Sequence, residues 1–204
     1  MTIFNLNFCK SASINPTGWN KISDFSAPRT QALEDDAGST AAGVEFSAAT
    51  AWTGASGGAA IANNALYGFP ELVWEFYFYA GSGAGVFDIT GLTSGDDYTI
   101  SLIGHRGNTG RDTDFTVEGV TTRYVQSASA TAMTAPVVFT GTVPGDGILS
   151  ISQQIVSVFS YCNGAILEVV AGGGGGGRTM GSLAGNGGLA GNGGLAGIGG
   201  GMAG

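Results

Sequence analysis

The stretch VFDITGLTSGDDYTISLI, residues 86–103, decides the fold class of this chain. It begins with the mainly apolar run Val86–Ile89, continues through the turn residues Thr93–Asp96, and ends with Tyr98–Ile103, in which apolar and polar side chains alternate. Successive side chains of a strand point to opposite faces, so this alternation is typical of a strand that buries one face. The stretch therefore predicts two strands separated by a turn.

The same organisation extends over residues 1–171, where helical periodicity is scarce and short apolar or alternating runs stand between turn signals. Further strands are expected at residues 3–8, 72–79, 114–117, 122–125, 136–142, 148–152 and 164–170, with a hairpin turn at Glu118-Gly119. Residues 31–68, rich in alanine, glycine and serine, are expected to hold long loops and one short helix. This many short strands predict an all-β fold, a jelly roll or β-sandwich.

Charge and composition exclude several classes of partner. Only 11% of the 204 residues are charged, and seven Lys+Arg against 15 Asp+Glu leave a net charge of −8. Nucleic acids and anionic membrane surfaces are bound by basic surfaces, so neither partner is expected. No apolar run approaches the ~18 residues that a membrane span requires. The start MTIFNLNF shows no signal peptide, and the many small polar residues are typical of an extracellular or virion protein.

The C-terminal segment, residues 172–204, consists largely of glycine. After six glycines it reads LAGNGG, LAGNGG and LAGIGG from Leu183 and closes with GMAG. Its six-residue period fits polyproline-II helices packed side by side or the coils of a β-helix, and a flexible tail is the alternative. Three repeats are too few to bury themselves, so an ordered segment must pack on another copy or another protein. The residues expected to mediate this assembly are Leu183, Leu189, Leu195, Ile198 and Met202.

Several motifs together resemble a known family. They are Trp19-Asn20, Leu33–Gly38, Phe87–Thr99, Gly104–Val117, Asp146–Ile151 and Asn163–Val169. In this order they resemble the galactose-binding-like (malectin-like) β-sandwich modules of bacterial surface and secreted proteins. The resemblance implies a jelly roll whose first and last strands are adjacent, with a carbohydrate-binding or adhesive role. In composition and repeat, the glycine-rich segment is similar to the glycine-rich domains of phage tail-fibre adhesins.

The sequence does not predict an enzyme. A catalytic triad needs a base, and His105 is the only histidine of the chain. No G-x-S-x-G motif accompanies it, and one histidine with two distant cysteines cannot form a zinc site. Acidic pairs such as Asp96-Asp97 and the Asp112/Asp114 pair are more simply explained by turn formation and by an ion pair between Asp112 and Arg111.

The acidic run Glu34, Asp35 and Asp36 offers two interpretations. Calcium prefers carboxylate and carbonyl oxygens, so the run is a candidate calcium site, and a solvated acidic loop is the alternative. Calcium is the only cofactor that the sequence suggests.

The two cysteines, Cys9 and Cys162, flank residues 3–8 and 165–170, which both read as strands. If these strands pair antiparallel, the cysteines lie nearly opposite each other. A disulfide would then close a very long loop. The alternative, two buried free thiols, is favoured because no export signal is present.

Sugar sites combine aromatic faces, which contact the apolar side of the ring, with amides and guanidinium groups that bind hydroxyls. Trp74 and Phe76 are instead expected in the core. The loop from Arg106 to Arg111 concentrates charge in a charge-poor chain and is the foremost candidate. The full set of candidate ligand-binding residues is Trp19, Asn20, Trp52, His105, Arg106, Asn108, Arg111, Tyr161 and Asn163.

Two functions remain open from the sequence. The first is a non-enzymatic phage virion protein, a tail or capsid appendage, whose sandwich (residues 1–171) is lectin-like and whose segment 172–204 docks to other virion proteins or to copies of itself, making a homo-oligomer. The alternative is a secreted bacterial carbohydrate-binding module with a flexible glycine-rich tail, located outside the cell or on its surface. In both, a cell-surface glycan is the expected small partner.

Overall fold

The structure is a computed structural model that describes residues 1–10, 13–57, 67–106, 111–126 and 134–172. These residues belong to one compact unit, Met1–Gly174. Asn108 lies outside the described residues, and so do the five assembly residues of the glycine-rich repeat. The docking role predicted for that repeat therefore stays a prediction. No helix among the described residues is long and apolar enough to cross a membrane.

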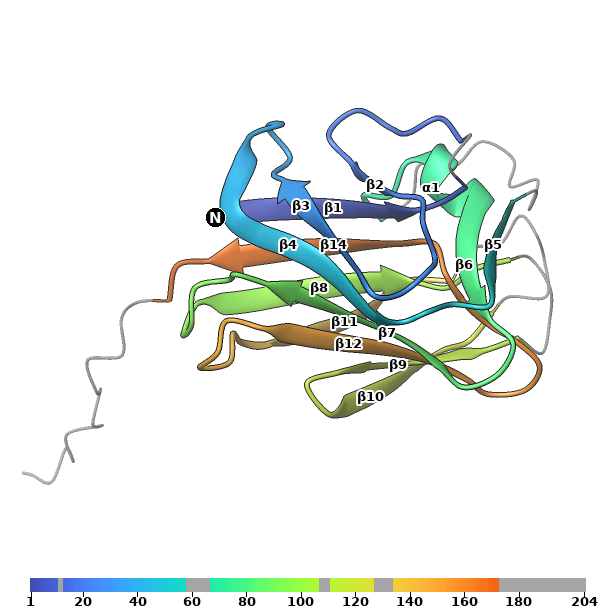
Figure 1. The fold of residues 1–204 in the computed structure, drawn as a ribbon. Coiled ribbons are helices and arrows are strands. Elements are labelled where there is room, and N and C mark those ends of the chain that lie inside the picture. The colour runs from blue at the N-terminus through green and yellow to red at the C-terminus, as the bar shows by residue number, and fades with distance from the viewer. Residues whose placement is uncertain (11–12, 58–66, 107–110, 127–133, 173–204) are drawn as a thin grey trace, which may run out of the picture. The chain divides into compact units, whose positions relative to one another are not determined.

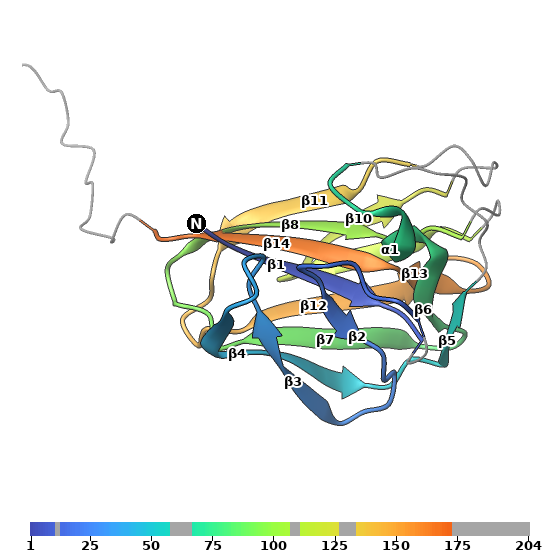
Figure 2. The ribbon, with the colours of Figure 1, turned by 90° about the horizontal axis from the view of Figure 1, so that it is seen from above.

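The fold is all-β and consists of two large sheets and a small third one (Figures 1 and 2). The first sheet has the order β11 (Val137–Thr142), β8 (Asp97–Ile103), β14 (Gly164–Val170), β1 (Thr2–Phe8) and β2 (Asn20–Ile22). The second has the order β10 (Val120–Tyr124), β9 (Thr113–Val117), β12 (Leu149–Ile155), β7 (Ala84–Thr90), β4 (Thr40–Thr50) and β3 (Arg29–Glu34). The third has the order β13 (Ser160–Cys162), β6 (Phe76–Ala80) and β5 (Gly54–Gly57). The predicted β-sandwich is therefore confirmed.

The core lies between the two large sheets and is formed by alternate residues of their strands. Along β7, every second residue is buried, and Phe87 and Ile89 are fully buried. From the first sheet, Phe8 packs within 5.2 Å (centroid to centroid) of the Phe87 ring and within 5.4 Å of Phe78. Burying such side chains stabilises the fold by roughly 1.5–3 kcal/mol each.

The expected adjacency of the first and last strands is confirmed. β1 and β14 pair antiparallel from Thr2↔Val169 to Asn7↔Gly164. The hairpin at Glu118-Gly119 is confirmed too: Val117 pairs with Val120, and both turn residues have positive φ, as a two-residue hairpin of type I′ requires.

Two sequence-based expectations are wrong. Residues 31–57 form most of β3 and all of β4 and β5 instead of long loops and a helix, because side chains such as Leu33, Val44 and Phe46 supply the buried face that a strand needs. The single strand expected at 72–79 is divided into α1 (Glu71–Glu75) and β6. Both α1 and β6 lie at the end of the sandwich opposite the N-terminus (Figure 1).

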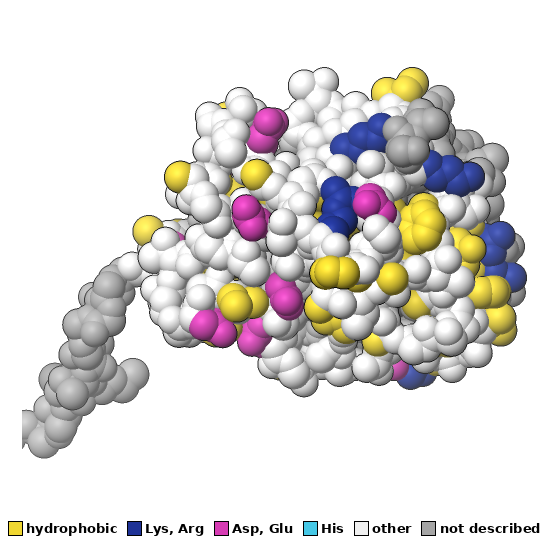
Figure 3. All heavy atoms as spheres, in the orientation of Figure 1, with side chains coloured by type: hydrophobic (Ala, Val, Ile, Leu, Met, Phe, Trp, Pro, Cys, Tyr) yellow, Lys and Arg dark blue, Asp and Glu magenta, His cyan; other side chains and the backbone are white. Residues whose placement is uncertain are grey.

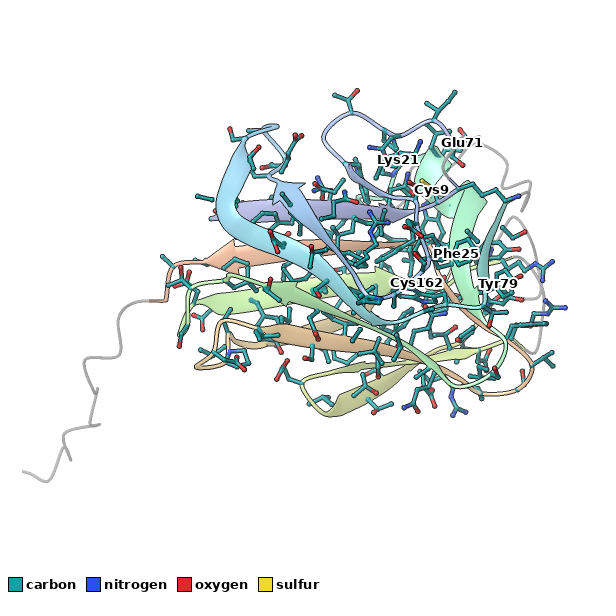
Figure 4. The ribbon with its side chains drawn as sticks, in the orientation of Figure 1. Cys9, Lys21, Phe25, Glu71, Tyr79 and Cys162 are labelled. Atoms are coloured by element: carbon teal, nitrogen blue, oxygen red, sulfur yellow. The ribbon has the colours of Figure 1, made fainter. Side chains whose placement is uncertain are left out.

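Cys9 and Cys162 are free and buried, so the disulfide alternative is wrong and the free-thiol interpretation is confirmed. The last hydrogen bond between the two strands joins Phe8 N–H to Asn163 O at 2.9 Å, and the cysteines beyond it diverge. The Cys9 N–H donates to Ile22 O on β2, and Cys162 belongs to β13, opposite Phe78 (Figure 4). Burial raises the pKa of Cys9 to about 11, against a smaller lowering by Lys21, and burial raises the pKa of Cys162 further.

Candidate functional site

A cavity of about 200 Å³ opens at the end of the sandwich that the third sheet covers. Its lining residues are Ser56, Tyr77, Tyr79, Arg106, Phe159 and Tyr161. We call this cavity the tyrosine pocket.

Strand pairing in the third sheet explains why three tyrosines line one cavity. Tyr77 and Tyr79 are two residues apart on β6, so they lie on the same face. Tyr161 on β13 pairs opposite Tyr79, and Ser56 on β5 pairs opposite Tyr77, which adds them to that face. Phe78 lies on the other face and belongs to the main core. β6 therefore presents tyrosines to the pocket and a phenylalanine to the core. Figure 4 labels Tyr79 at this end of the molecule.

The aromatic rings form a rigid floor and two accessible walls. Tyr77 and Tyr161 are nearly buried and meet edge to face, with ring centroids 4.8 Å apart. Tyr79 and Phe159 are half-buried, and their rings are 5.7 Å apart, also edge to face. Edge-to-face pairs are a favoured arrangement of aromatic rings, so this cluster is packed before any ligand arrives.

Two arginines converge on one tyrosine oxygen. The Tyr161 hydroxyl accepts a hydrogen bond from Nη1 of Arg106 at 3.0 Å and another from Nη1 of Arg111 at 2.5 Å. The Arg106 guanidinium also lies 5.7 Å and 5.6 Å from the ring centroids of Tyr77 and Tyr161, within cation–π range. The Arg111 guanidinium lies 5.5 Å from the ring centroid of Phe159. Burial alone lowers the pKa of Arg106, but the hydroxyls of Tyr161 and Tyr77 outweigh it and raise the pKa, so this arginine stays charged.

Gln126 positions the backbone that carries both arginines. Its side-chain oxygen accepts from Arg106 N at 3.2 Å, and its amide donates to Gly104 O at 2.8 Å and to Arg111 O at 2.7 Å. A Cβ at Gly104 would lie 2.4 Å from Tyr161 O, so only glycine allows β8 to approach β13 this closely. The arginines are thus held by a fixed frame, although residues 107–110 between them lie outside the described part of the chain.

The structure brings together three of the predicted ligand-binding residues, Arg106, Arg111 and Tyr161. The expected ion pair between Arg111 and Asp112 is absent from the described residues. The Asp112 carboxylate instead accepts from Gln126 N at 3.0 Å.

Trp52, His105 and Asn163 are buried and are not among the residues that line the tyrosine pocket. The Trp52 indole donates to Oε1 of Gln153 at 2.9 Å inside the core. The His105 ring meets the Trp74 ring edge to face at 5.9 Å. Neither ring nitrogen of His105 has a hydrogen-bond partner among the described residues, and burial lowers the pKa of this histidine.

Asn20 and Trp19 also have packing roles. The Asn20 amide donates to Asn5 O and Glu34 O and accepts from Glu34 N, which joins β1 of the first sheet to β3 of the second. Trp19 is half-buried, with its ring 5.7 Å from that of Phe69. Neither side chain lines the tyrosine pocket.

For Glu34, Asp35 and Asp36, the structure supports the acidic-loop interpretation and gives no support to a calcium site. Among the described residues, no group of three or more His, Cys, Asp or Glu is arranged to hold a metal ion. Oδ1 of Asp35 accepts from Ala37 N at 3.0 Å and Ser39 N at 2.8 Å, so this carboxylate closes the β3–β4 turn. Asp35 thus serves local backbone bonding, as turn aspartates commonly do.

Sequence reasoning missed Ser56, Tyr77, Tyr79, Phe159 and Gln126. The signal for two of them was the run FYFYA at 76–80, where tyrosine alternates with phenylalanine and alanine. Such alternation places the tyrosine hydroxyls on one face. The other three have no local signature, because only the chain's long-range pairing brings them to the pocket.

No family model matches the chain, and no curated protein matches it. Among solved structures, protein YxiM from Bacillus subtilis is similar over 83% of this chain and 40% of its own, with 14% identity and a TM-score of 0.46. The CBM35 from Cellvibrio japonicus Abf62 is similar over 59% of this chain and 90% of its own, with 12% identity and a TM-score of 0.36. The CBM36-1 domain of a multidomain xylanase from the hindgut metagenome of Trinervitermes trinervoides is similar over 52% and 83%, with 15% identity and a TM-score of 0.27.

This chain thus spans less than half the length of YxiM. At these identities and TM-scores, none of the three structures identifies a ligand or a reaction for this chain. Its function has to be derived from its own residues.

Proposed function

We propose that this chain is an extracellular, non-catalytic carbohydrate-binding module whose sugar site is the tyrosine pocket. The observation that carries the proposal is a preformed cavity that is lined by accessible aromatic walls and the Arg106 guanidinium. The Arg111 guanidinium lies beside it, on the same Tyr161 hydroxyl. Aromatic rings pack against the apolar face of a pyranose, and guanidinium N–H groups donate to its oxygens. This function is the alternative of the two that the sequence leaves open.

The size of the pocket favours one sugar residue. Pockets for drug-sized ligands are typically ~300–1,000 Å³, so a cavity of about 200 Å³ accommodates a single ring. A site of this size at the end of a sandwich suits the terminal residue of a glycan better than the middle of an extended chain.

The chemistry of the pocket supports binding without catalysis. Neither a carboxylate nor an imidazole is among the described residues that line it, so the groups that most often act as general acid or base are not part of the described lining. His105 lies close in sequence to Arg106 but is buried against Trp74, and its ring nitrogens have no hydrogen-bond partner among the described residues.

The virion function depends on the repeat that begins at Leu183, which lies outside the described residues. No described contact supports it, nor the virion partners or the homo-oligomer that go with it.

A glycan array followed by isothermal titration calorimetry tests the proposal. Tyr79→Ala and Phe159→Ala each remove one accessible wall of the pocket, and we expect each to weaken binding of the best sugar about tenfold, equivalent to ~1.4 kcal/mol. Phe25→Ala is the matched control, since Phe25 is 40% exposed but does not line the pocket. The proposal is wrong if no sugar binds, or if a sugar binds equally well to the wild type and to both pocket variants.

A further inference from the structure

Neither Arg106 nor Arg111 forms an ion pair with an acid among the described residues. The two ion pairs found among the described residues join Arg29 to Asp24 and Arg123 to Asp114, and none of these four side chains lines the pocket. Arg106 and Arg111 meet at the neutral hydroxyl of Tyr161, and the described residues that line the pocket include no acid. Two guanidinium groups that share one acceptor repel each other, and an anion placed between them would remove that repulsion.

The hydrogen-bonding capacity of the pair is largely unused within the described chain. A guanidinium carries five N–H donors in a planar fork. The hydrogen bonds to Tyr161 use one donor of Arg106 and one of Arg111. A carboxylate presents two coplanar oxygens, which match the guanidinium fork and allow one oxygen for each arginine.

The distribution of charge along the sandwich points the same way. Acidic residues concentrate at the turns and strand ends opposite the pocket: Asp35, Asp36, Asp96, Asp97, Glu118 and Asp146. Lys10, Arg29, Arg106, Arg111 and Arg123 lie at strand ends on the pocket side, together with the acidic residues Asp24, Glu71, Asp112 and Asp114. On the face drawn in Figure 3, acidic side chains accordingly gather toward one end and most basic ones toward the other. Arg29 and Arg123 pair with Asp24 and Asp114, whereas Arg106 and Arg111 form no ion pair with a described acid. The attraction for an anion is therefore local to the arginine pair.

We propose that the sugar residue bound in the tyrosine pocket is acidic and that its carboxylate is held between Arg106 and Arg111. The aromatic walls, Tyr79 and Phe159, contact the ring of the same sugar. This inference rests on the proposed carbohydrate-binding function and specifies its ligand class, a glycan with a terminal uronic acid.

Matched pairs of monosaccharides test the proposal by calorimetry at low ionic strength. D-glucuronate is compared with D-glucose and D-galacturonate with D-galactose, since each pair differs only in a carboxylate against a hydroxymethyl group. We expect the acidic member of at least one pair to bind ten times more tightly or better, and its affinity to fall as sodium chloride is added. Galactose 6-sulfate is an additional probe, in which a sulfate ester replaces the carboxylate as the anionic group. It is expected to bind more weakly than galacturonate.

Substitutions locate the effect. Arg106→Gln and Arg111→Gln are each expected to reduce uronate affinity to that of the neutral sugar. Arg123 is an exposed arginine at the same end that pairs with Asp114 and does not line the pocket. Arg123→Gln is therefore expected to leave the uronate affinity unchanged. Thermal melting confirms that each variant is folded.

Two outcomes overturn the inference and leave the proposed function intact: equal binding of acidic and neutral sugars through the aromatic walls, or tighter binding of the sulfate ester. Loss of uronate binding in Arg123→Gln equal to that in Arg106→Gln also overturns it. If neither acidic nor neutral sugars bind, and the glycan array shows no binding, both the inference and the proposed function are wrong.

Discussion

The side-chain oxygen of Asn163 accepts a hydrogen bond from the backbone N–H of His105 at 2.7 Å, although the two residues are 58 positions apart. Nδ2 of Asn163 donates to Trp74 O at 3.1 Å, so one buried amide joins the end of β8, the end of α1 and the start of β14. The residue after His105 is Arg106. The position of the guanidinium in the pocket therefore depends on a polar contact inside the protein.

Replacing Asn163 with alanine should destabilise the protein. The change leaves a buried N–H and a buried C=O unpaired, and each orphaned group costs about 1–3 kcal/mol, so we expect a loss of about 2–6 kcal/mol in the free energy of unfolding. Urea denaturation measures it, with Gln154→Ala on the exposed side of β12 as control. A loss no larger than that of the control would show that this amide does not fix the end of β8.

A methyl group at Gly85 should not be tolerated. A Cβ at this position would lie 2.2 Å from Nε1 of Trp52, which the core holds in place. We expect Gly85→Ala to cost about 1–3 kcal/mol of stability through overpacking. At Gly145, by contrast, nothing lies within 4 Å of the added Cβ, and Gly145→Ala should be neutral or stabilise by up to ~1 kcal/mol. Equal melting temperatures for the two variants would contradict the packing described for Trp52.

His105 should make the stability fall as the pH drops below its ordinary pKa of 6.5. Burial lowers its pKa in the folded state, so above pH 6.5 the imidazole is neutral in both states and contributes no pH dependence. Below pH 6.5, His105 is protonated in the unfolded chain but stays neutral in the folded chain. The free energy of unfolding therefore falls by up to ~1.4 kcal/mol per pH unit until the folded-state pKa is reached.

Denaturant titrations between pH about 7.5 and about 5.5 test this expectation, a range above the ordinary pKa values of Asp and Glu. His105→Leu removes the titrating ring and should flatten the dependence. Identical slopes for the wild type and His105→Leu would show that the histidine is protonated equally in both states.

Neither cysteine should react with a thiol reagent in the native protein. Both are buried, and burial raises both pKa values, so little thiolate forms at neutral pH. Ellman's reagent is expected to label both thiols only after denaturation, at the rate of unfolding. Rapid labelling of Cys9 in native buffer would contradict its placement between β1 and β2.

The sequence predicted the sandwich because its strands carry the signal locally. Stretches such as Tyr98–Ile103 alternate apolar and polar residues. The turn at Glu118-Gly119 is predicted from two adjacent residues alone. The β3–β4 region was missed because its buried positions include Ala48 among many small residues, which weakens the contrast between the two faces.

The candidate site was predicted only in part for a different reason. Arg106 and Arg111 were found because charge is rare in this chain, so charged residues near one another are conspicuous. Tyr161 was proposed because its aromatic ring and hydroxyl suit a sugar. Trp52 and Asn163 were proposed as ligands because residue type does not reveal burial. Tyr79 was missed because its place in the pocket follows from the pairing of β6 with β13, a contact between residues about 80 positions apart that no local pattern records.

The most direct test of the account is an NMR titration that follows the side-chain Nε–H signals of the arginines while D-galacturonate or D-glucuronate is added. The account predicts that the signals of Arg106 and Arg111 shift together, along a single saturable curve, while those of Arg29 and Arg123 stay in place. Shifts at Arg123 of the same size, or no shift at Arg106 at saturating sugar, would contradict the claim that the tyrosine pocket binds an acidic glycan.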